Sequence, residues 1–589
     1  MMNCKTIFEY ILKEESSFYL PINVNEWDWS FADHLKTSFF YKHGRLLTGN
    51  TDDKPVKNIV KPILNLQYRT EDIDVKDIVL YVDNPDKFHL SFLLKKYHDD
   101  VYLKENNLDD FIDTTKEENI DYGGVIIEDI GQNVPEYHPL QSIAFCDQTD
   151  ILSGVICFKY FLSPDQLLEM TDRGWGLDSN GADISLEELL VLSQKDEKDK
   201  KDKKGAPIKT PGKYVEIYRV SGSMPQYWLE SDGEKYVYQT QIVAFYIDSK
   251  NEKQGVTLFK KKDNKKRFKV FKRDPINGRA LGWGGVEELF DPQVWVNYDK
   301  IQIKNMLDAA SKTILQTDDG AFAARNKLKN MDNLEIAVVE DGKTIRQVDT
   351  FPRNSSLFDK SSLEWEEHAK TLGDANDALA GKSPTSGTPF ALQELVTNTS
   401  MGMHDYRMGK YAKWLEEVYR DFIIPKMIKE ITKGTKFLSS LSMEEMQEVA
   451  DKMVEFEAYK FKKEMVLNGE TFTDEEVEAK KVEIRKSFMA DNKKFIEILK
   501  EEFKGLPVAI NINIAGKQKD LSAQVQKLGN IFRQIISNPA VLDDPRMSKL
   551  FNQILESSGL SPIDFATPAQ QIPQGAPAPQ ANKTNEQLL

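Results

Sequence analysis

The most recognisable chemical pattern in the sequence is Gly381-Lys382-Ser383, which matches the last residues of a phosphate-binding loop. That motif also requires a glycine five positions earlier, where this chain has Asn376, and a strand leading into it. A helical pattern precedes the tripeptide instead, and Pro384 would disrupt a helix that began there. The sequence therefore argues against nucleotide binding and leaves a small, polar loop between two helices.

A second chemically marked stretch is a basic run over 259–273, interleaved with Phe268 and Phe271. The residues of this run that could face phosphates are Lys260, Lys261, Lys265, Lys266, Arg267 and Lys269. Lysines along a strand edge also prevent the edge from pairing with another chain. The pattern leaves both interpretations open, a contact with nucleic acid and a protected edge.

Few residues suit catalysis or metal binding. The seven histidines are scattered, and the three cysteines form no Cys-x-x-Cys pair, so the sequence predicts no metal site and no cofactor. Three cysteines are also too few for a disulfide framework, and we expect a reducing cytoplasm as the compartment of synthesis. No tight group of Asp and Glu stands at the ends of predicted strands. We expect a protein that is not an enzyme.

The net charge of -16 argues against static binding of DNA, which requires clustered Lys and Arg. Two interpretations remain. The charge can simply provide solubility, or it can repel phosphates from the walls of a channel through which a duplex slides. No apolar run approaches the roughly 18 residues that a membrane span needs.

The elements that position the loop begin at a glycine-rich turn, Gly282-Trp283-Gly284-Gly285. The predicted order is a helix from Val286 to about Leu315, a polar hairpin over 333–350, a helix from Ser361 to about Leu379, the loop 380–388, and a long helix from Pro389 to Pro425. The apolar stripe of the first helix runs from Leu289 through Val296 and Leu307 to Ile314. The hairpin pairs 334–339 with 344–348 around an Asp-Gly turn.

The flanking regions are predicted to be independently ordered. Ahead of the turn, strands and helices alternate, with capping-box signals at Ser163 and Ser185, and a two-residue period follows from 213 to 271. The charged run 195–204 cannot be buried and is predicted to be a solvated loop. After 434 come two charged helices over about 442–503, a strand over 507–514 and a helix over 521–536. From about 561 a Pro/Gln/Ala tail is expected to be disordered.

This order of elements resembles the portal proteins of tailed bacteriophages. Ser386-Gly387-Thr388-Pro389-Phe390-Ala391-Leu392 is similar to the entry of the portal backbone helix, and 285–297 is similar to the run into the first stem helix. The late segment 512–535, a strand and a Gln-rich helix, resembles that of some podovirus-type portals. The resemblance implies an α+β multidomain fold with an α/β wing, a helical stem, a small β-hairpin clip, a long backbone helix and a helical crown.

The implied boundaries follow the chain in order. They are a wing over 1–281 with a disordered loop near 195–206, stem helices over 282–317 and 361–377 around a clip over 318–360, a tunnel loop over 378–388, a backbone helix over 389–434, a crown-like region over 435–560, and a disordered tail over 561–589.

The resemblance further implies a homododecameric ring at one capsid vertex, through which double-stranded DNA is packaged and ejected. The tunnel-loop residues that would touch DNA without reading its sequence are Lys382, Ser383, Thr385, Ser386 and Thr388. The clip residues that would meet the terminase large subunit or the head-tail adaptor are Asn333, Glu335, Glu340, Lys343 and Arg346. Wing residues would meet scaffold and major capsid protein, and the protein would reside in the virion.

Three other functions are compatible with the same sequence. One is another virion structural protein, such as a head-tail adaptor or scaffold, without a DNA channel. Another is a DNA-processing enzyme, which the incomplete phosphate loop disfavours. The third is a cellular interaction scaffold, which a monomeric or dimeric state in solution would favour.

Overall fold

The chain forms two compact units in the computed structural model: Met1–Ile73 with Asn106–Ile423 (unit 1), and Asp74–Glu105 with Ile424–Leu589 (unit 2). The residues whose placement is described are 5–45, 55–73, 78–82, 88–194, 214–229, 235–247, 253–263, 267–311, 315–325, 341–348, 355–375, 379, 401–431, 443–468, 473–490 and 508–512. Every strand pairing among them is antiparallel.

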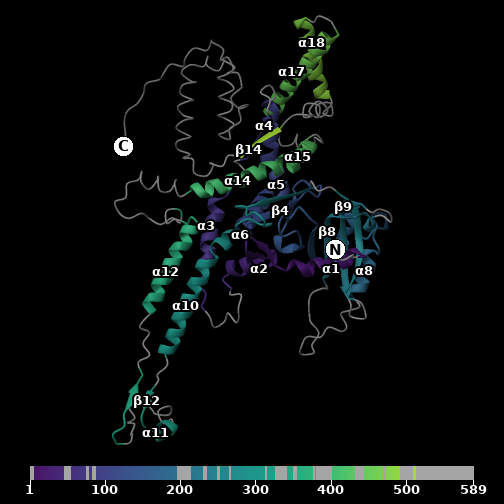
Figure 1. Ribbon diagram of the computed structural model, residues 1–589. Coiled ribbons are helices and arrows are strands. Elements are labelled where there is room, and N and C mark those ends of the chain that lie inside the picture. Colours follow the sequence, from purple (N-terminus) through teal and green to yellow (C-terminus); the bar gives the residue numbers. More distant parts are fainter. Residues whose placement is uncertain are drawn as a thin grey trace, which may run out of the picture. The chain divides into compact units, whose positions relative to one another are not determined.

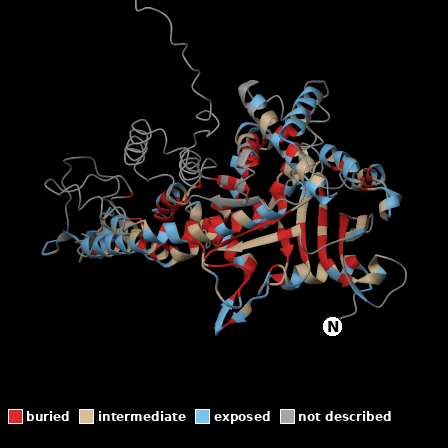
Figure 2. Ribbon diagram, turned by 90° about the horizontal axis from the view of Figure 1, so that it is seen from above, coloured by how far each residue is buried: buried red, intermediate tan, exposed pale blue. Residues whose placement is uncertain are grey.

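The main sheet of unit 1 has five strands in the order β10-β9-β8-β7-β6. Its central strands β8 and β9 are labelled in Figure 1. They are β6 (Ile143–Phe145), β7 (Ile156–Leu162), β8 (Val215–Pro225), β9 (Tyr236–Ile247) and β10 (Lys253–Lys262). Alternation along the strands sends residues to both faces: Tyr218 and Val220 join one core, and Val215 and Ile217 another. Because both faces are covered, the strands are buried along much of their length (Figure 2).

Helices cover the two faces of this sheet. The first core includes α1 (Ile7–Phe18), and the second includes α7 (Pro164–Glu169) and α8 (Leu186–Gln194). The capping boxes predicted at Ser163 and Ser185 are confirmed, since each side chain accepts the N–H three residues later. Short 3-10 turns lie at Leu140–Ser142, Met170–Arg173, Asp178–Asn180 and Gln226–Trp228.

A second sheet of unit 1 has the order β11-β4-β5, formed by β11 (Phe268–Lys272), β4 (Gly124–Glu128) and β5 (Glu136–His138). The glycine-rich turn packs against its edge, where the Gly282 and Arg273 N–H groups both donate to the Gly123 carbonyl. A Cβ added to Gly282 would lie 1.4 Å from the Arg273 carbonyl oxygen. The turn therefore requires glycine because backbone packs on backbone.

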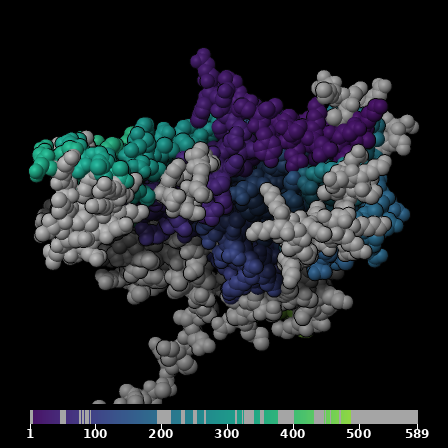
Figure 3. All heavy atoms as spheres, turned by 90° about the horizontal axis from the view of Figure 1, so that it is seen from below, coloured from purple at the N-terminus to yellow at the C-terminus, as the bar shows by residue number. Residues whose placement is uncertain are grey.

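The remaining helices of the unit 1 body are α2 (Phe31–Lys42), α3 (Val60–Thr70) and α6 (Leu108–Tyr122), with the small hairpin β1 (Ile22–Val24) and β2 (Trp27–Trp29). In the space-filling view from below, N-terminal residues lie along one side of the molecule (Figure 3). A third core joins α3 to the helices that follow the glycine-rich turn, through Ile63, Leu64, Leu289 and Val296.

Those helices are α9 (Gly285–Glu288), α10 (Phe290–Ala310) and α12 (Ser355–Leu372), with β12 (Leu315–Thr317), α11 (Gly320–Arg325) and β13 (Ile345–Gln347) between the last two. The first predicted stem helix is thus interrupted at Leu289, because Pro292 has no N–H to continue α9. It also ends at Ala310, since 315–317 pair with 345–347. The predicted partner strand 334–339 lies outside the described residues.

The second stem helix also differs from its prediction. It begins at Ser355 rather than Ser361 and ends at Leu372 rather than near 377. Gly373 follows, and Asp374 has a positive φ of 50°, a left-handed conformation that stops the helix.

The long helix after the loop is described from α14 (Gly402–Val418) onward, followed by a π-helical turn at Tyr419–Ile423 and by α15 (Ile424–Ile431). The α-helical hydrogen bonding therefore changes before Pro425, the residue predicted to kink or end this helix. Pro425 itself lies in the first turn of α15, where a missing N–H costs little.

Unit 2 contains α4 (Phe88–Tyr97), a π-helical turn at His98–Tyr102, α5 (Leu103–Asn106) at its boundary, α15, α17 (Met443–Leu467) and α18 (Asp474–Ala490). The two charged helices pack together, with an Arg485–Asp451 ion pair at 2.5 Å. The predicted strand is confirmed as β14 (Val508–Ile512), and it pairs with β3 (Ile78–Val82). Residues 74–105, predicted within the domain 1–281, therefore belong with the C-terminal region.

Candidate functional site

A pair of helices, α10 and α12, forms the centre of the candidate site, and we call residues 290–372 the helical arm. The two helices pack along each other and carry the β12–β13 pair between them in the chain (Figure 1). Trp295 stacks on Trp365 with ring centroids 6.0 Å apart and planes at 11°. Lys300 pairs with Asp359 at 2.9 Å. Ring stacking and an ion pair thus hold the arm together beyond its buried base.

The base of the arm is buried, whereas its continuation exposes large apolar side chains. Leu289 and Val296 are fully buried, but Leu307, on the same predicted stripe, is 53% exposed. Other exposed apolar residues of the arm are Trp295, Tyr298, Leu315, Val348, Leu357 and Leu363. Apolar side chains gathered on one projecting element are typical of a surface that binds another chain.

The segment 380–400, which contains most of the predicted tunnel loop 378–388, lies outside the described residues, and hydrogen bonds hold the described residues on either side of it. Before it, Leu379 is buried, and its carbonyl accepts a 3.0 Å hydrogen bond from Arg69. The Gly373 carbonyl accepts from the buried Gln67 side chain at 3.3 Å. After it, His404 in α14 approaches the Asp374 carbonyl at 3.3 Å. Helices α3 and α14 therefore both contact described residues within 373–379.

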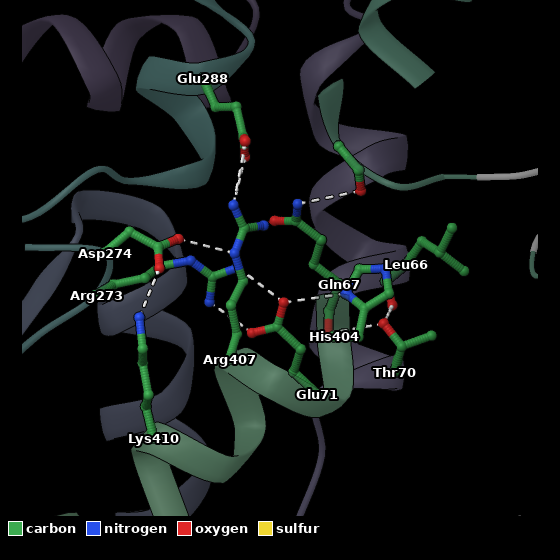
Figure 4. Close-up of polar contacts among 11 residues, drawn as sticks. Leu66, Gln67, Thr70, Glu71, Arg273, Asp274, Glu288, His404, Arg407 and Lys410 are labelled. Atoms are coloured by element: carbon green, nitrogen blue, oxygen red, sulfur yellow. Dashed lines mark hydrogen bonds and ion pairs between the residues drawn. The ribbon is translucent and has the colours of Figure 1, made fainter. Parts of the chain in front are cut away.

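His404 also belongs to a largely buried ionic cluster (Figure 4). We define it as Glu71, Arg273, Asp274, Glu288, His404, Arg407 and Lys410. Arg273 donates to both Glu71 carboxylate oxygens, at 2.5 and 2.7 Å, and both side chains are almost fully buried. His404 places Nδ1 3.1 Å from Glu71, so its two ring nitrogens face a carboxylate and a carbonyl.

The second half of the cluster ties α14 to the base of the arm. Arg407 donates to Asp274 at 2.9 Å and to Glu288 at 3.1 Å. Glu288 is the last residue of α9, and Asp274 lies just before the glycine-rich turn with a positive φ of 34°. Lys410, one helical turn further, also reaches Asp274 at 3.3 Å. Helix α14, the turn and the start of the arm are therefore joined by charge pairs.

Electrostatics in the cluster favour the charged form of Glu71. Burial raises the pKa of the Glu71 carboxyl, but Arg273 and the hydrogen bond from His404 outweigh burial and lower that pKa to about 2. A buried ion pair of this kind adds little net stability by itself, whereas removing one partner leaves an uncompensated charge. The cluster thus fixes geometry at the junction more than it adds stability.

The described residues of the basic run are mostly engaged inside unit 1. Arg267 contacts Glu128 at 2.5 Å and also pairs with Asp263. Lys269 reaches Asp421 at 2.7 Å. Lys260 and Lys261 lie at the end of β10, where the Lys260 stem would meet a Cβ on Gly181. Lys265 and Lys266 lie outside the described residues.

Among the predicted clip residues, Lys343 and Arg346 are described. Arg346 lies in β13 and is exposed, opposite Gln316 in β12, and Lys343 is partly exposed. Asn333, Glu335 and Glu340 lie outside the described residues, as do the tunnel-loop residues Lys382, Ser383, Thr385, Ser386 and Thr388.

Sequence reasoning missed the ionic cluster, because its members lie at positions 71, 273–288 and 404–410. No local spacing signals their proximity. Within the part of the chain that the structure describes, no group of His, Cys, Asp or Glu is arranged to hold a metal ion. Nor does any helix there have the length and apolar character to cross a membrane.

Comparisons with known proteins gave a distant structural likeness. No family model matches the chain, and no curated protein matches it. A chain in a solved structure titled "Virion of native gene transfer agent (GTA) particle" aligns with 69% of this chain and 81% of its own length, at 10% identity and a TM-score of 0.28. A likeness at this level is too low to establish a shared fold.

Proposed function

We propose that this protein is a portal-type ring subunit, which forms a channel for double-stranded DNA at one capsid vertex. The observation that carries the proposal is the helical arm with its anchored junction. An arm of two helices emerges from the body, its end at 373–379 contacts α3 and α14, and α14 is the next described helix of the chain. This order agrees with the stem, tunnel loop and backbone helix that the sequence resembles.

Ring assembly gives a role to the exposed apolar residues of the arm. Leu307 and Leu363 are more than half exposed in the single chain. In a ring of repeated copies, each arm would pack on its neighbours and remove these side chains from water. The proposed assembly is a homododecamer, non-enzymatic and without a cofactor.

The loop within 380–400 is the proposed contact with DNA. Lys382 supplies one cation, and Ser383, Thr385, Ser386 and Thr388 supply hydroxyls that can exchange partners along a phosphate backbone. A chain with a net charge of -16 otherwise repels DNA, so a duplex would slide rather than stick. The distal pair β12–β13, with Lys343 and Arg346, is the proposed docking site for the terminase large subunit and the head-tail adaptor. Scaffold and major capsid protein would contact the body of unit 1.

The test of the loop's role compares Lys382→Glu with Lys235→Glu, a reversal at an exposed lysine of unit 1. The Lys382 variant is expected to form normal rings but to change the amount of DNA packaged or retained, because a negative loop repels phosphates. The Lys235 variant is expected to behave as wild type in both assays. Normal packaging combined with disrupted rings in the Lys382 variant would contradict the proposal.

A further inference from the structure

Unit 1 carries two open clefts that share the side chain of Phe39. The first, of about 310 Å³, is lined by mainly apolar residues and is called here the apolar cleft. Its lining includes Phe18, Tyr19, Phe31, Leu35 and Ile143. The second, of about 550 Å³, is called the acidic cleft, and five carboxyl groups line it: Asp110, Asp113, Glu117, Glu118 and Asp121.

The acidic cleft arises from the sequence of α6. Four of its carboxylates, at 110, 113, 117 and 121, recur at intervals of three and four residues and so share one face of that helix, and Glu118 lies next to Glu117. On the opposite wall, α2 contributes Phe39, Lys42 and His43. Lys42 is the one Lys or Arg side chain of the lining, and burial together with Lys42 lowers the pKa of His43. Burial raises the pKa of Glu118 to about 7, so this carboxyl is partly protonated at neutral pH, and the other four carboxyls outnumber Lys42 and leave the cleft with a net negative charge.

Part of this negative charge is already compensated within unit 1. Lys42 pairs with Asp121, which also accepts from Tyr68. Lys116 pairs with Asp113 at 2.7 Å. Asp110 and Glu117 are exposed, and neither has an ion-pair partner among the described residues. Two carboxylates at the open side of the cleft thus remain available to a cation from outside.

The apolar cleft exposes side chains that a soluble surface would ordinarily cover. Phe39 is 41% exposed, and Tyr19 at the rim is 60% exposed. Leu35 and Phe31 form a buried floor beneath them. An apolar side chain from a partner would find ring contacts here on several sides, with Phe39 as the wall common to both clefts.

We propose that these clefts together dock a segment of a partner protein that carries a large apolar side chain and, beside it, one or two Lys or Arg side chains. Charge complementarity selects this occupant, because an acidic or purely apolar segment would leave Asp110 and Glu117 desolvated without a counter-charge. The proposal does not depend on ring formation or on DNA.

The separation of the two clefts along α2 sets the spacing of the partner's side chains, and the partner's cation would face Asp110 and Glu117 on the wall opposite Lys42. Leu35, in the apolar cleft, and Lys42, in the acidic cleft, are seven residues apart, or about 10 Å at 1.5 Å per residue. A helical partner would match this separation with its apolar and basic residues seven positions apart. An extended partner would match it with about three positions, at roughly 3.3 Å per residue.

The test is selection of a library of random twelve-residue peptides on the full-length protein. The counter-target is the double variant Asp110→Lys/Glu117→Lys, whose changes fall on exposed side chains that a folded protein tolerates. Peptides with a large apolar residue and Lys or Arg at one of the two spacings are expected to be enriched. An enriched peptide, labelled for fluorescence anisotropy, should bind the double variant and Phe39→Ser at least about tenfold more weakly, with salt weakening wild-type binding. Glu169→Lys, a reversal at the exposed end of α7, should bind like wild type.

Three outcomes would overturn the proposal. One is the absence of any enriched class, and another is equal binding by wild type and the double variant. The third is loss of self-association in the double variant without peptide binding to wild type, which would assign the clefts to a second copy of this chain. Because ring formation is measured separately by microscopy, failure here leaves the proposed function untouched.

Discussion

The Arg273→Met substitution should destabilise unit 1 strongly, because it leaves the Glu71 carboxylate buried without its main counter-charge. The Glu71 and Arg273 side chains are 4% and 3% exposed. Removing one partner of a buried pair costs about 3–5 kcal/mol. The pKa of Glu71 gives a similar figure, since a drop from 4.5 to about 2 corresponds to about 3 kcal/mol.

The pH dependence of this contribution has a definite sign. Glu71 has a lower pKa in the folded state than in the unfolded chain, so its stabilisation is present above pH 4.5 and is lost as pH falls towards about 2. In Arg273→Met that acid-sensitive component should be much smaller. The contrast between the two proteins should therefore shrink as the pH is lowered through this range.

The assay is urea denaturation followed by tryptophan fluorescence, with Lys410→Met as the matched control. Lys410 pairs with Asp274 in the same cluster, but its side chain is 33% exposed, so its loss should cost no more than about 1 kcal/mol. A double-mutant cycle with Glu71→Gln should recover part of the Arg273→Met loss, because no charge then remains buried. A loss below about 1 kcal/mol for Arg273→Met, equal to that of the control, would refute the reasoning.

Three further predictions concern the body and the arm. Burial raises the pKa of Glu118 to about 7, so the free energy of unfolding should fall as pH rises from 4.5 to 7. In urea denaturation, the stability of Glu118→Gln relative to wild type should therefore increase by about 3 kcal/mol between pH 5 and 8. A difference that stays constant with pH would contradict this. Gly282→Ala should lower the free energy of unfolding by about 3 kcal/mol, because the added Cβ meets a backbone carbonyl oxygen. The control Gly320→Ala should be neutral or stabilising, since its Cβ would have no heavy atom within 4 Å. Equal effects of the two substitutions would count against the close-packed turn. Leu289→Ala should lower the free energy of unfolding by about 2–5 kcal/mol, because Leu289 is buried. Leu307→Ser should change that free energy by no more than about 0.5 kcal/mol, because Leu307 is exposed, but it should reduce ring assembly in mass photometry. Intact rings in Leu307→Ser would exclude Leu307 from the interface.

Local signals predicted local structure well. Ser163 with Gln166 predicted a capped helix start, and the structure has that capping box. Alternation over 507–514 predicted the strand found at Val508–Ile512. These signals act over a few residues, through hydrogen bonds and side-chain periodicity, so they are legible in a single sequence.

The pairing of strands that are distant in the sequence could not be predicted in the same way. No pattern in the neighbouring sequence indicates that β14 pairs with β3, at Ile78–Val82. Residues 74–105, which contain β3, therefore belong to unit 2 and not to the predicted N-terminal domain. The end of the first stem helix was also mispredicted, because an apolar stripe continues past Ala310 although the chain there turns to form β12. In both cases contacts distant in sequence decided the outcome.

The candidate site was predictable only in part. The glycine-rich turn and the two helices of the arm were expected from sequence, and the structure contains them. The ionic cluster was not expected, because Glu71, Arg273 and His404 lie far apart in the sequence and contact one another only in the folded protein. The acidic face of α6, by contrast, could have been found from its three- and four-residue spacing.

The central claim, that this chain builds a ring with a channel, is tested most directly by negative-stain electron microscopy of the purified protein, with mass photometry on the same sample and scaffold protein added in a parallel preparation. The account predicts closed rings, near twelve copies, with a central hole wide enough for duplex DNA. Stable monomers that form no rings even with scaffold present would contradict it and would favour an adaptor or an interaction scaffold.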